Sequence, residues 1–406
     1  MTCPVHEPMP LPSDSGLLLE PLPDLIRLLR EEPVRKVRFP NGIEAWFLSG
    51  YEHFRAMLND PRFSNRMGDT PPGLRAVDTE TDADPGVMMN LPGNFVTADG
   101  EDHQHYRRKL TKEFMVKRIA ALRPRIQEIV DQHLDDVARR SGPVDLVPTF
   151  TLPVPSMVIA ELLGVPYEQR GAFQHAANTL LGLTTTAEEM QGAWARLAEI
   201  LAVVFDARMS DPQEDLISHL LHEQSELSRE ELTTICVVLL VAGHETTANF
   251  SGLAIAHLLR QPEQLAKFIA HPDEAARAVE EIMRYLIGLT AGGGLIRRAL
   301  EDVEIGGQLI RAGEWVVAGM AAANIDPQLC PHAEQLDLDR GPVPHVAFGY
   351  GPHACLGQNL ARAELEIMLV SLFSRFPNLR LAEPIEDLPY REQMLVPGFH
   401  ALPVTW

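Results

Sequence analysis

The sequence predicts a mainly α-helical fold with a minor β part, and three observations support this. Apolar residues recur at helical spacing over most of residues 102–287. Turn dipeptides that join paired strands occur outside that region, at Asn41-Gly42 and Gly306-Gly307. Hydrophobic residues make up 45% of the 406 residues, which is ample for one large core. No Gly/Ser-rich linker or internal repeat divides the chain, so we expect a single domain over residues 1–406.

The first elements expected are a hairpin and a short helix. Val37 to Leu48 forms the hairpin around Asn41-Gly42, and a helix follows near Tyr51–Asn59. Residues 67–98 are rich in Pro, Gly, Asp and Thr and show no period. They predict a long loop, which in a compact enzyme is more often a lid than a linker, with disorder as the alternative.

Helices dominate the middle of the chain. The longest pattern covers residues 229–260 and would extend about 45 Å, enough to cross a whole domain. Strand pairs are expected again at 302–318 and in the C-terminal tail, and a helix from Gln358 to Phe376. Further helices are expected at about 102–139, 155–163, 168–182, 188–209, 213–223, 262–270 and 273–287.

The charge of the chain limits its partners. The net charge is −21, which argues against nucleic acid as a partner. Residues 101–125 nevertheless carry eight basic residues against three acids, either as a solvated helix face or as a docking surface for an acidic protein. The eight are Arg107, Arg108, Lys109, Lys112, Lys117, Arg118, Arg123 and Arg125.

Nothing in the sequence predicts a membrane or secretory segment. The longest strongly apolar run, Ile235–Ala242, is too short to span a bilayer, and Met1–Pro12 lacks a signal-peptide pattern. The four cysteines share no pairing or zinc-like spacing, which fits a reducing compartment. We therefore expect a cytoplasmic protein without a membrane anchor. The cysteines are Cys3, Cys236, Cys330 and Cys355.

One cysteine has unusual surroundings. Residues 348–357 read Phe-Gly-Tyr-Gly-Pro-His-Ala-Cys-Leu-Gly, so Cys355 lies in a glycine-rich turn just before the helix expected from Gln358. The positive end of a helix dipole favours thiolate over thiol, and glycines let the backbone pass close to a flat ligand such as a porphyrin. A thiolate is the axial iron ligand suited to oxygen activation. The alternative is a cysteine that acts as a small buried hydrophobe.

Two further patterns lie on predicted helices. Residues 242–247 read Ala-Gly-His-Glu-Thr-Thr, a run that includes poor helix formers inside the longest helix and so suggests function. Small side chains at Ala242 and Gly243 would leave room for a ligand, and a threonine hydroxyl can bond to a carbonyl one turn earlier. A metalloprotease site would need histidine at Ala248 and is excluded. Glu281 and Arg284 share one helix face, a spacing typical of an ordinary exposed pair.

These patterns together resemble the cytochrome P-450 family. The decapeptide fits the haem-ligand signature F-G-x-G-x-H-x-C-x-G at every fixed position, from Phe348 to Gly357. The resemblance extends over nearly the whole chain, because the motifs occur in the family's order. It implies the family's mainly α fold with a long central helix over haem, and haem b as the cofactor.

The resemblance also assigns roles to individual residues. Cys355 would be the axial thiolate, and the Glu281–Arg284 pair would be buried and support the ligand loop. Glu245 and Thr246 would relay protons during the reduction of dioxygen. Other cofactor-binding residues would be His103, Arg107, Arg297 and His353 at the propionates, together with Ala242, Gly243, Phe348 and Gly349.

The implied reaction inserts one oxygen atom of O₂ into a sizeable, mostly apolar organic molecule, as in natural-product tailoring or xenobiotic oxidation. A chain of 406 residues contains no flavin or nicotinamide domain, so a ferredoxin with its reductase would supply electrons. It would dock at the basic face Arg107–Arg125 of a monomer. The substrate pocket would be lined by residues 67–98, 171–212, 239–242, 289–295 and 395–399.

Two other functions are alternatives to the monooxygenase. A peroxide-using haem-thiolate enzyme would not need the acid–alcohol pair, and a non-catalytic haem-bound recruitment module would not need to keep Glu245, Thr246 and Cys355.

The sequence departs from the family pattern at two places. Ile325 stands where soluble bacterial members often have arginine, and Cys330 lies near a common phenylalanine position. Both departures concern local packing.

Overall fold

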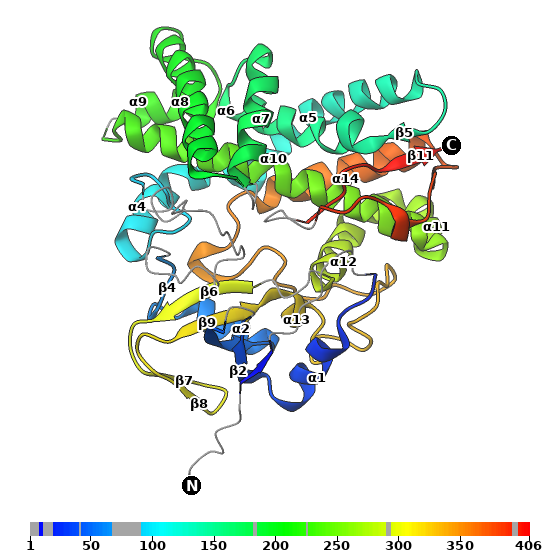
Figure 1. Cartoon of the computed structure of the whole chain (residues 1–406). Helices are drawn as coiled ribbons and strands as arrows, with labels where there is room; N and C mark the ends of the chain where they lie inside the picture. The colour runs from blue at the N-terminus through cyan, green and yellow to red at the C-terminus, as the bar shows by residue number, and fades with distance from the viewer. Residues whose placement is uncertain are drawn as a thin grey trace. The chain divides into compact units, whose positions relative to one another are not determined.

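The computed structural model describes residues 8–10, 19–39, 42–66, 91–181, 185–224, 226–289, 294–391 and 397–406. It contains two compact units (Figure 1). Unit 1 consists of residues 1–78 and 280–355, and unit 2 consists of residues 79–279 and 356–406. The chain is mainly α-helical with small sheets, as the sequence predicts. A single domain over residues 1–406 stays a prediction.

Unit 1 is built on a six-stranded sheet in the order β1-β2-β3-β9-β6-β4. The predicted first hairpin is confirmed as the antiparallel pair β2–β3, and Gly42 has the positive φ of +85° that suits a tight turn. The second predicted β region contains the β7–β8 hairpin, which turns at Gly306 and Gly307. The strands are β1 (Met9–Pro10), β2 (Val34–Arg38), β3 (Glu44–Leu48), β4 (Phe63–Ser64), β6 (Gly294–Ala299), β7 (Val303–Ile305), β8 (Gln308–Ile310) and β9 (Trp315–Gly319).

Both faces of the unit 1 sheet are covered by helices. Alternate residues of β3 therefore belong to two different hydrophobic clusters. Trp46 and Leu48 pack in a cluster with α2 (Tyr51–Asn59), whereas Ala45 and Phe47 pack with α1 (Pro23–Glu31). Strand side chains point to opposite faces in turn, so one hydrophobic strand serves two layers. Unit 1 also contains α13 (Met320–Asn324) and α12 (Ala275–Gly288) from Glu280 onward.

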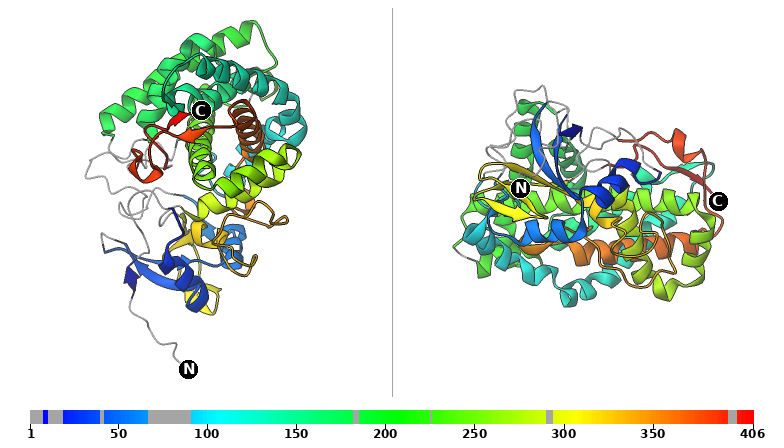
Figure 2. Two further views of the ribbon diagram at one scale, coloured as in Figure 1. Left: turned by 90° about the vertical axis from the view of Figure 1, so that its right-hand side faces the viewer. Right: turned by 90° about the horizontal axis from the view of Figure 1, so that it is seen from below.

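Unit 2 is a helical assembly around α10 (Arg229–Arg260). This helix has the bounds that the sequence predicts, begins with a Ser228–Glu231 capping box and contacts α6, α14, α8 and α7 (Figures 1 and 2). Its buried residues occur on every side, as expected for a central helix. The other helices of unit 2 are α4 (Gly100–Thr111), α5 (Val116–Ala138), α6 (Pro153–Leu163), α7 (Arg170–Leu181), α8 (Ala187–Ser210), α9 (Leu216–Glu223), α11 (Pro262–Ala270) and α14 (Gln358–Arg375).

A small sheet closes unit 2. It pairs β10 (Arg380–Leu381), β11 (Pro403–Thr405) and β5 (Val144–Asp145), with β11 in the middle. The strands predicted in the C-terminal tail are therefore confirmed. Among the described residues, none of the helices combines the length and the apolar character needed to cross a bilayer.

One helix prediction is wrong. The sequence predicts a single helix over 102–139, but the chain breaks between α4 and α5 through a short 3-10 turn at Lys112–Phe114. The break buries Glu113 and Phe114. Asn359 of α14 donates its side-chain amide to the carbonyl oxygen of Phe114 at 2.9 Å. The Phe114 carbonyl at the break is thus satisfied by a residue 245 positions later in the sequence. Helical periodicity cannot reveal a partner at this distance.

Candidate active site

The predicted site residues are divided between the two units, and each group is described within its own unit. Arg297, Phe348, Gly349, His353 and Cys355 belong to unit 1, together with the Glu281–Arg284 pair. The members in unit 2 are His103, Arg107, Ala242, Gly243, Glu245 and Thr246.

The loop that carries Cys355 is held by its own backbone. The Cys355 amide donates to the Phe348 carbonyl at 2.8 Å, and the Gly349 amide donates to the Val346 carbonyl at 2.9 Å. Gly349 and Gly351 both have φ of +70°, and a Cβ atom at Gly351 would lie 2.6 Å from the Leu58 carbonyl oxygen. The glycines are therefore required by the loop itself. Cys355 is exposed, whereas cysteines are usually among the most buried residues.

The Glu281–Arg284 pair is buried, as the family resemblance implies. Arg284 has no exposed side-chain surface and Glu281 only 6%. The Arg284 guanidinium donates to both Glu281 carboxylate oxygens at 2.8 Å each. It also donates to the backbone carbonyls of Asn324, Ala333 and Gln335. An arginine fork can make this many contacts at once, and a lysine cannot.

Two residues that the sequence reasoning missed extend this pair. Arg340 donates to the Glu281 carboxylate at 3.1 Å and to the carbonyls of Pro331 and His332. The side-chain carbonyl of Asn324 accepts the Val346 amide at 2.8 Å. Val346 begins the turn that leads into the Cys355 loop. The buried pair therefore connects to the ligand loop through Asn324.

The other candidates in unit 1 lie on rigid elements. Arg297 is a buried residue of β6, and His353 ends a 3-10 turn at Gly351–His353. The Nδ1 atom of His353 lies 3.4 Å from the side-chain nitrogen of Asn65. Asn65 follows β4, and no sequence pattern marks it.

In unit 2, Ala242 and Thr246 are accessible positions of α10, one turn apart. Ala242 is exposed and Thr246 partly exposed. The Thr246 hydroxyl donates to the Ala242 carbonyl oxygen at 2.7 Å, which confirms the predicted bond to the preceding turn.

Gly243 has a packing role. The sequence predicts that its missing side chain leaves room for a ligand, but a Cβ atom there would lie 2.8 Å from the Ile159 side chain of α6. Gly243 therefore lets α10 and α6 approach closely. The role of Ala242 and Gly243 beside a ligand stays a prediction.

Glu245 is fully buried and ion-paired within unit 2. Its Oε1 atom accepts a bond of 2.6 Å from the Arg391 guanidinium, and its Oε2 atom has no hydrogen-bond partner among the residues that the structure describes. Burial raises the pKa of the carboxyl, and Arg391 opposes this shift. The neighbouring His244 packs against Phe173, and burial lowers its pKa to about 4.

His103 and Arg107 lie on one face of α4, as predicted. Burial lowers the pKa of His103, and the nearby charge of Arg107 lowers it further. A pair of donors of this kind suits a carboxylate ligand.

Many basic side chains of residues 101–125 are ion-paired with acidic residues of unit 2. Lys109 pairs with Glu226, Arg118 with Glu113 and Arg123 with Glu366, and Arg125 bonds to Glu128 and Glu161. Lys112 is 69% exposed and lies 3.9 Å from Glu223. The charge available to a partner is thus smaller than the sequence count suggests.

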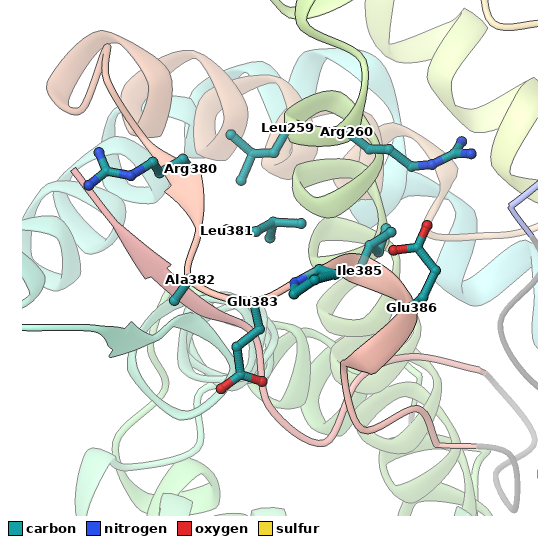
Figure 3. A pocket seen from close by; sticks show the side chains of 9 residues that line it. Leu259, Arg260, Arg380, Leu381, Ala382, Glu383, Ile385 and Glu386 are labelled. Atoms are coloured by element: carbon teal, nitrogen blue, oxygen red, sulfur yellow. The ribbon is translucent and has the colours of Figure 1, made fainter.

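A shallow hollow of about 470 Å³ in unit 2 does not belong to these residues (Figure 3). It is lined by Leu259 and Arg260 at the end of α10 and by residues 380–386. Leu259 follows Thr246 by 13 residues, which is about 20 Å along a helix. Of the predicted pocket lining, residues 67–90, 182–184, 290–293 and 395–396 lie outside the described residues.

The chain is similar to known proteins over nearly its whole length. The family model described as Cytochrome P450 matches residues 172–396. Cytochrome P450-SU2 of Streptomyces griseolus is 41% identical over 96% of this chain and 95% of its own length. Pentalenic acid synthase of Streptomyces avermitilis is 41% identical over 99% and 98%. The crystal structure of CYP105P1 in complex with filipin I is 40% identical, covers 98% of this chain and 99% of its own, and has a TM-score of 0.89.

The chain belongs to the cytochrome P450 family. It is a cytochrome P450 monooxygenase and its cofactor is haem b, iron protoporphyrin IX. The residues present fit this cofactor, since an exposed cysteine stands in a rigid glycine loop and arginine and histidine donors are available for carboxylates. The described residues contain no cluster of three or more His, Cys, Asp or Glu side chains that could hold a metal ion.

Proposed function

We propose that this cytochrome P450 oxidises a sizeable, mostly apolar organic molecule with electrons from a ferredoxin, and that Cys355 ligates its haem iron. The observation that carries the proposal is the Cys355 loop. It combines an exposed thiol, two left-handed glycines and a backbone bond from Cys355 to Phe348. Such a loop fixes the sulfur before any ligand arrives, and preorganisation of this kind favours tight binding.

The other residues hold the cofactor at its edges. Within unit 1, Arg297 and His353 would bind propionates through charge-assisted hydrogen bonds, and within unit 2 His103 and Arg107 would offer donors of the same kind. Phe348 and Gly349 would contact the porphyrin next to Cys355, and Ala242 would leave room for it beside α10. When bound, the haem–thiolate group supplies the reductive activation of O₂ and the transfer of one oxygen atom to substrate.

Glu245 and Thr246 would relay the protons that this reaction consumes. Thr246 offers a hydroxyl at an accessible position of α10, and among the described residues the Oε2 atom of its neighbour Glu245 has no hydrogen-bond partner. Burial raises the pKa of this carboxyl, and a raised pKa makes a carboxylate a stronger base than an exposed glutamate.

The relatives support a natural product or a foreign compound as the substrate. One relative is named for pentalenic acid and one solved structure holds filipin I. We infer that the substrate of this chain is also larger than a simple metabolite.

The electron donor is an acidic ferredoxin that docks around the start of α5. Met115 and Val116 are exposed apolar residues, and Lys112 and Lys117 beside them are exposed. An apolar centre with a charged rim is typical of protein interfaces. Arg108, in the last turn of α4, is a further exposed basic residue of this segment.

Carbon monoxide binding tests the ligand assignment. The dithionite-reduced protein under carbon monoxide should show the strongly red-shifted Soret band of a thiolate-ligated haem. Cys355→Ser should lose this band, and Cys330→Ser, which changes a buried cysteine of the same unit, should keep it. A wild-type protein that binds haem without the shift, or a Cys355→Ser variant that keeps it, would exclude Cys355 as the ligand.

Charge reversal tests the docking face. Lys112→Glu with Lys117→Glu should raise the KM for ferredoxin several-fold and weaken its salt dependence. Arg139→Glu with Arg140→Glu, two exposed residues at the other end of α5, is the control with the same change in net charge. Equal effects at both ends of the helix would contradict docking at the start of α5.

A further inference from the structure

We propose that Arg391 is the positioning residue for proton delivery, because its guanidinium holds Glu245 in place as a carboxylate. This inference rests on the proposed role of Glu245. It assigns a function to a residue of the C-terminal segment that no motif marks.

The contact between the two residues is direct and largely shielded from solvent. A terminal guanidinium nitrogen of Arg391 donates to Glu245 Oε1 at 2.6 Å. The Glu245 side chain has no exposed surface and the Arg391 side chain has 12%. Charge-assisted bonds of this length are among the stronger hydrogen bonds in proteins.

Arg391 is itself held from two further sides. Its other terminal nitrogen donates to the Asn249 side-chain carbonyl at 3.2 Å, and its backbone amide donates to the Gly398 carbonyl at 2.8 Å. Asn249 lies one turn after Glu245 on α10, so two residues of one helix face bind the same guanidinium. A Cβ atom at Gly398 would lie 2.5 Å from the Asn249 side-chain oxygen, and glycine avoids this clash.

The residues next to Arg391 and Gly398 are paired as well. Tyr390 and Phe399 form an antiparallel bridge, and their rings lie 5.9 Å apart in an edge-to-face arrangement. The guanidinium is therefore presented to α10 by a braced piece of backbone. Little conformational freedom remains to be lost when it binds the carboxylate.

Glu245 needs this partner because its surroundings disfavour a charge. Burial without a counter-ion would drive the carboxyl to its neutral form. Arg391 is the charged group that acts on it, since the adjacent His244 is neutral near pH 7 and directs its Nδ1 to the Leu240 carbonyl. The pair occupies only Oε1, which leaves Oε2 to accept a proton and pass it on.

Infrared spectroscopy tests the position of this proton without using catalysis. At neutral pH, Arg391→Gln should gain the carbonyl stretching band of a protonated carboxylic acid. Arg391→Lys should not gain it, because a cation remains. The double variant Arg391→Gln with Glu245→Gln should lack the band, which assigns it to Glu245. A band that persists in the double variant, or that never appears in Arg391→Gln, would overturn the proposal.

Coupling of electrons to product gives the second measurement on the holoenzyme. Arg391→Gln should lose coupling several-fold, Arg391→Lys should restore most of it, and the double variant should be no worse than Glu245→Gln alone. Arg380→Gln, which removes an exposed charge from the same C-terminal segment, is the matched control. Additive losses in the double variant would mean that Arg391 acts independently of Glu245, which contradicts the proposal.

Different results would contradict the proton relay through Glu245 and the positioning role of Arg391. If Glu245→Gln couples as well as wild type, the proton relay in the proposed function is wrong, whatever the infrared result. If Glu245→Gln uncouples and Arg391→Gln does not, only the positioning role is wrong. The Soret band under carbon monoxide confirms in each variant that the haem site is intact.

Discussion

Asn324 and Val346 are joined by a hydrogen bond of 2.8 Å, in which the Val346 amide donates to the Asn324 side-chain carbonyl. The backbone carbonyl of the same asparagine accepts a bond of 2.8 Å from Arg284. One residue thus connects a buried ion pair to the turn that leads into the Cys355 loop. Because Asn324 is fully buried, water cannot replace either bond.

Asn324→Leu should therefore destabilise unit 1 and loosen the ligand loop. Leucine has a similar size but leaves the Val346 amide without its acceptor, which costs about 1–3 kcal/mol of unfolding free energy. Denaturant unfolding measures this loss. The same variant should show a smaller share of thiolate-ligated haem in the carbon monoxide spectrum. Asn59→Leu, on the exposed end of α2, should change stability by less than about 0.5 kcal/mol.

Two glycines on helices of unit 2 should respond to alanine in opposite directions. Gly243→Ala gains about 0.5–1 kcal/mol of helix propensity but forces a contact with Ile159, and overpacking of this kind costs about 1–3 kcal/mol. A Cβ atom at Gly192 meets nothing within 4 Å, so Gly192→Ala should stabilise α8. Thermal unfolding of both variants gives the signs. If Gly243→Ala stabilises the protein as much as Gly192→Ala does, the close α10–α6 contact is not a constraint.

Local sequence patterns predicted the elements well where a helix or hairpin is specified by its own residues. α2 and α10 have the predicted bounds, because each follows one helical period, and α10 also begins at the Ser228–Glu231 capping box. The break between α4 and α5 was missed, because the residue that satisfies its open carbonyl, Asn359, lies on α14. Periodicity reports a helix face and carries no information about such distant partners.

The site shows the same limit. A linear motif pointed to Cys355, and the family resemblance, not the i, i+3 spacing alone, pointed to Glu281 and Arg284 as a buried pair. Asn324 and Arg340 bond to this pair, and Arg391 bonds to Glu245. These three residues occupy positions with no signal of their own, since each bonds to a residue that is distant in the sequence. Asn249 could have been found, because it lies four residues after Glu245 on the same helix. The packing of Gly243 against Ile159 could not be predicted, because a missing side chain can serve a ligand or a neighbouring helix equally well.

Thr246→Ala should separate oxygen reduction from product formation. Removing the hydroxyl takes away a proton donor and acceptor while leaving the cofactor contacts in place, so peroxide release should rise several-fold and coupling should fall. Peroxide and product are quantified per electron consumed. Thr233→Ala is the matched control, because Thr233 also lies on α10 and donates to the carbonyl four residues earlier, at 2.8 Å. Unchanged coupling in Thr246→Ala, or an equal loss in Thr233→Ala, would count against the relay.

Acid should destabilise the protein through its buried histidines. Burial lowers the pKa of His244 and of His257 to about 4 each, whereas the unfolded chain binds these protons below about 6.5. The unfolded state therefore binds more protons between these values, and stability is lost as the pH falls from about 6.5 towards 4. Between pH 7 and pH 5 each histidine should account for about 2 kcal/mol of this loss.

His257→Gln isolates one histidine, because His257 lies near the end of α10 and away from Glu245. Denaturation midpoints at pH 7 and pH 5 should differ less in this variant than in wild type, by the contribution of one histidine. The buried carboxyls Glu245 and Glu364 have raised pKa values and act in the opposite direction, but they are common to both proteins and cancel. His332→Gln, at a side chain that is 74% exposed, should leave the pH dependence as in wild type. An unchanged pH dependence in His257→Gln would show that His257 is already solvated and protonated in the folded protein.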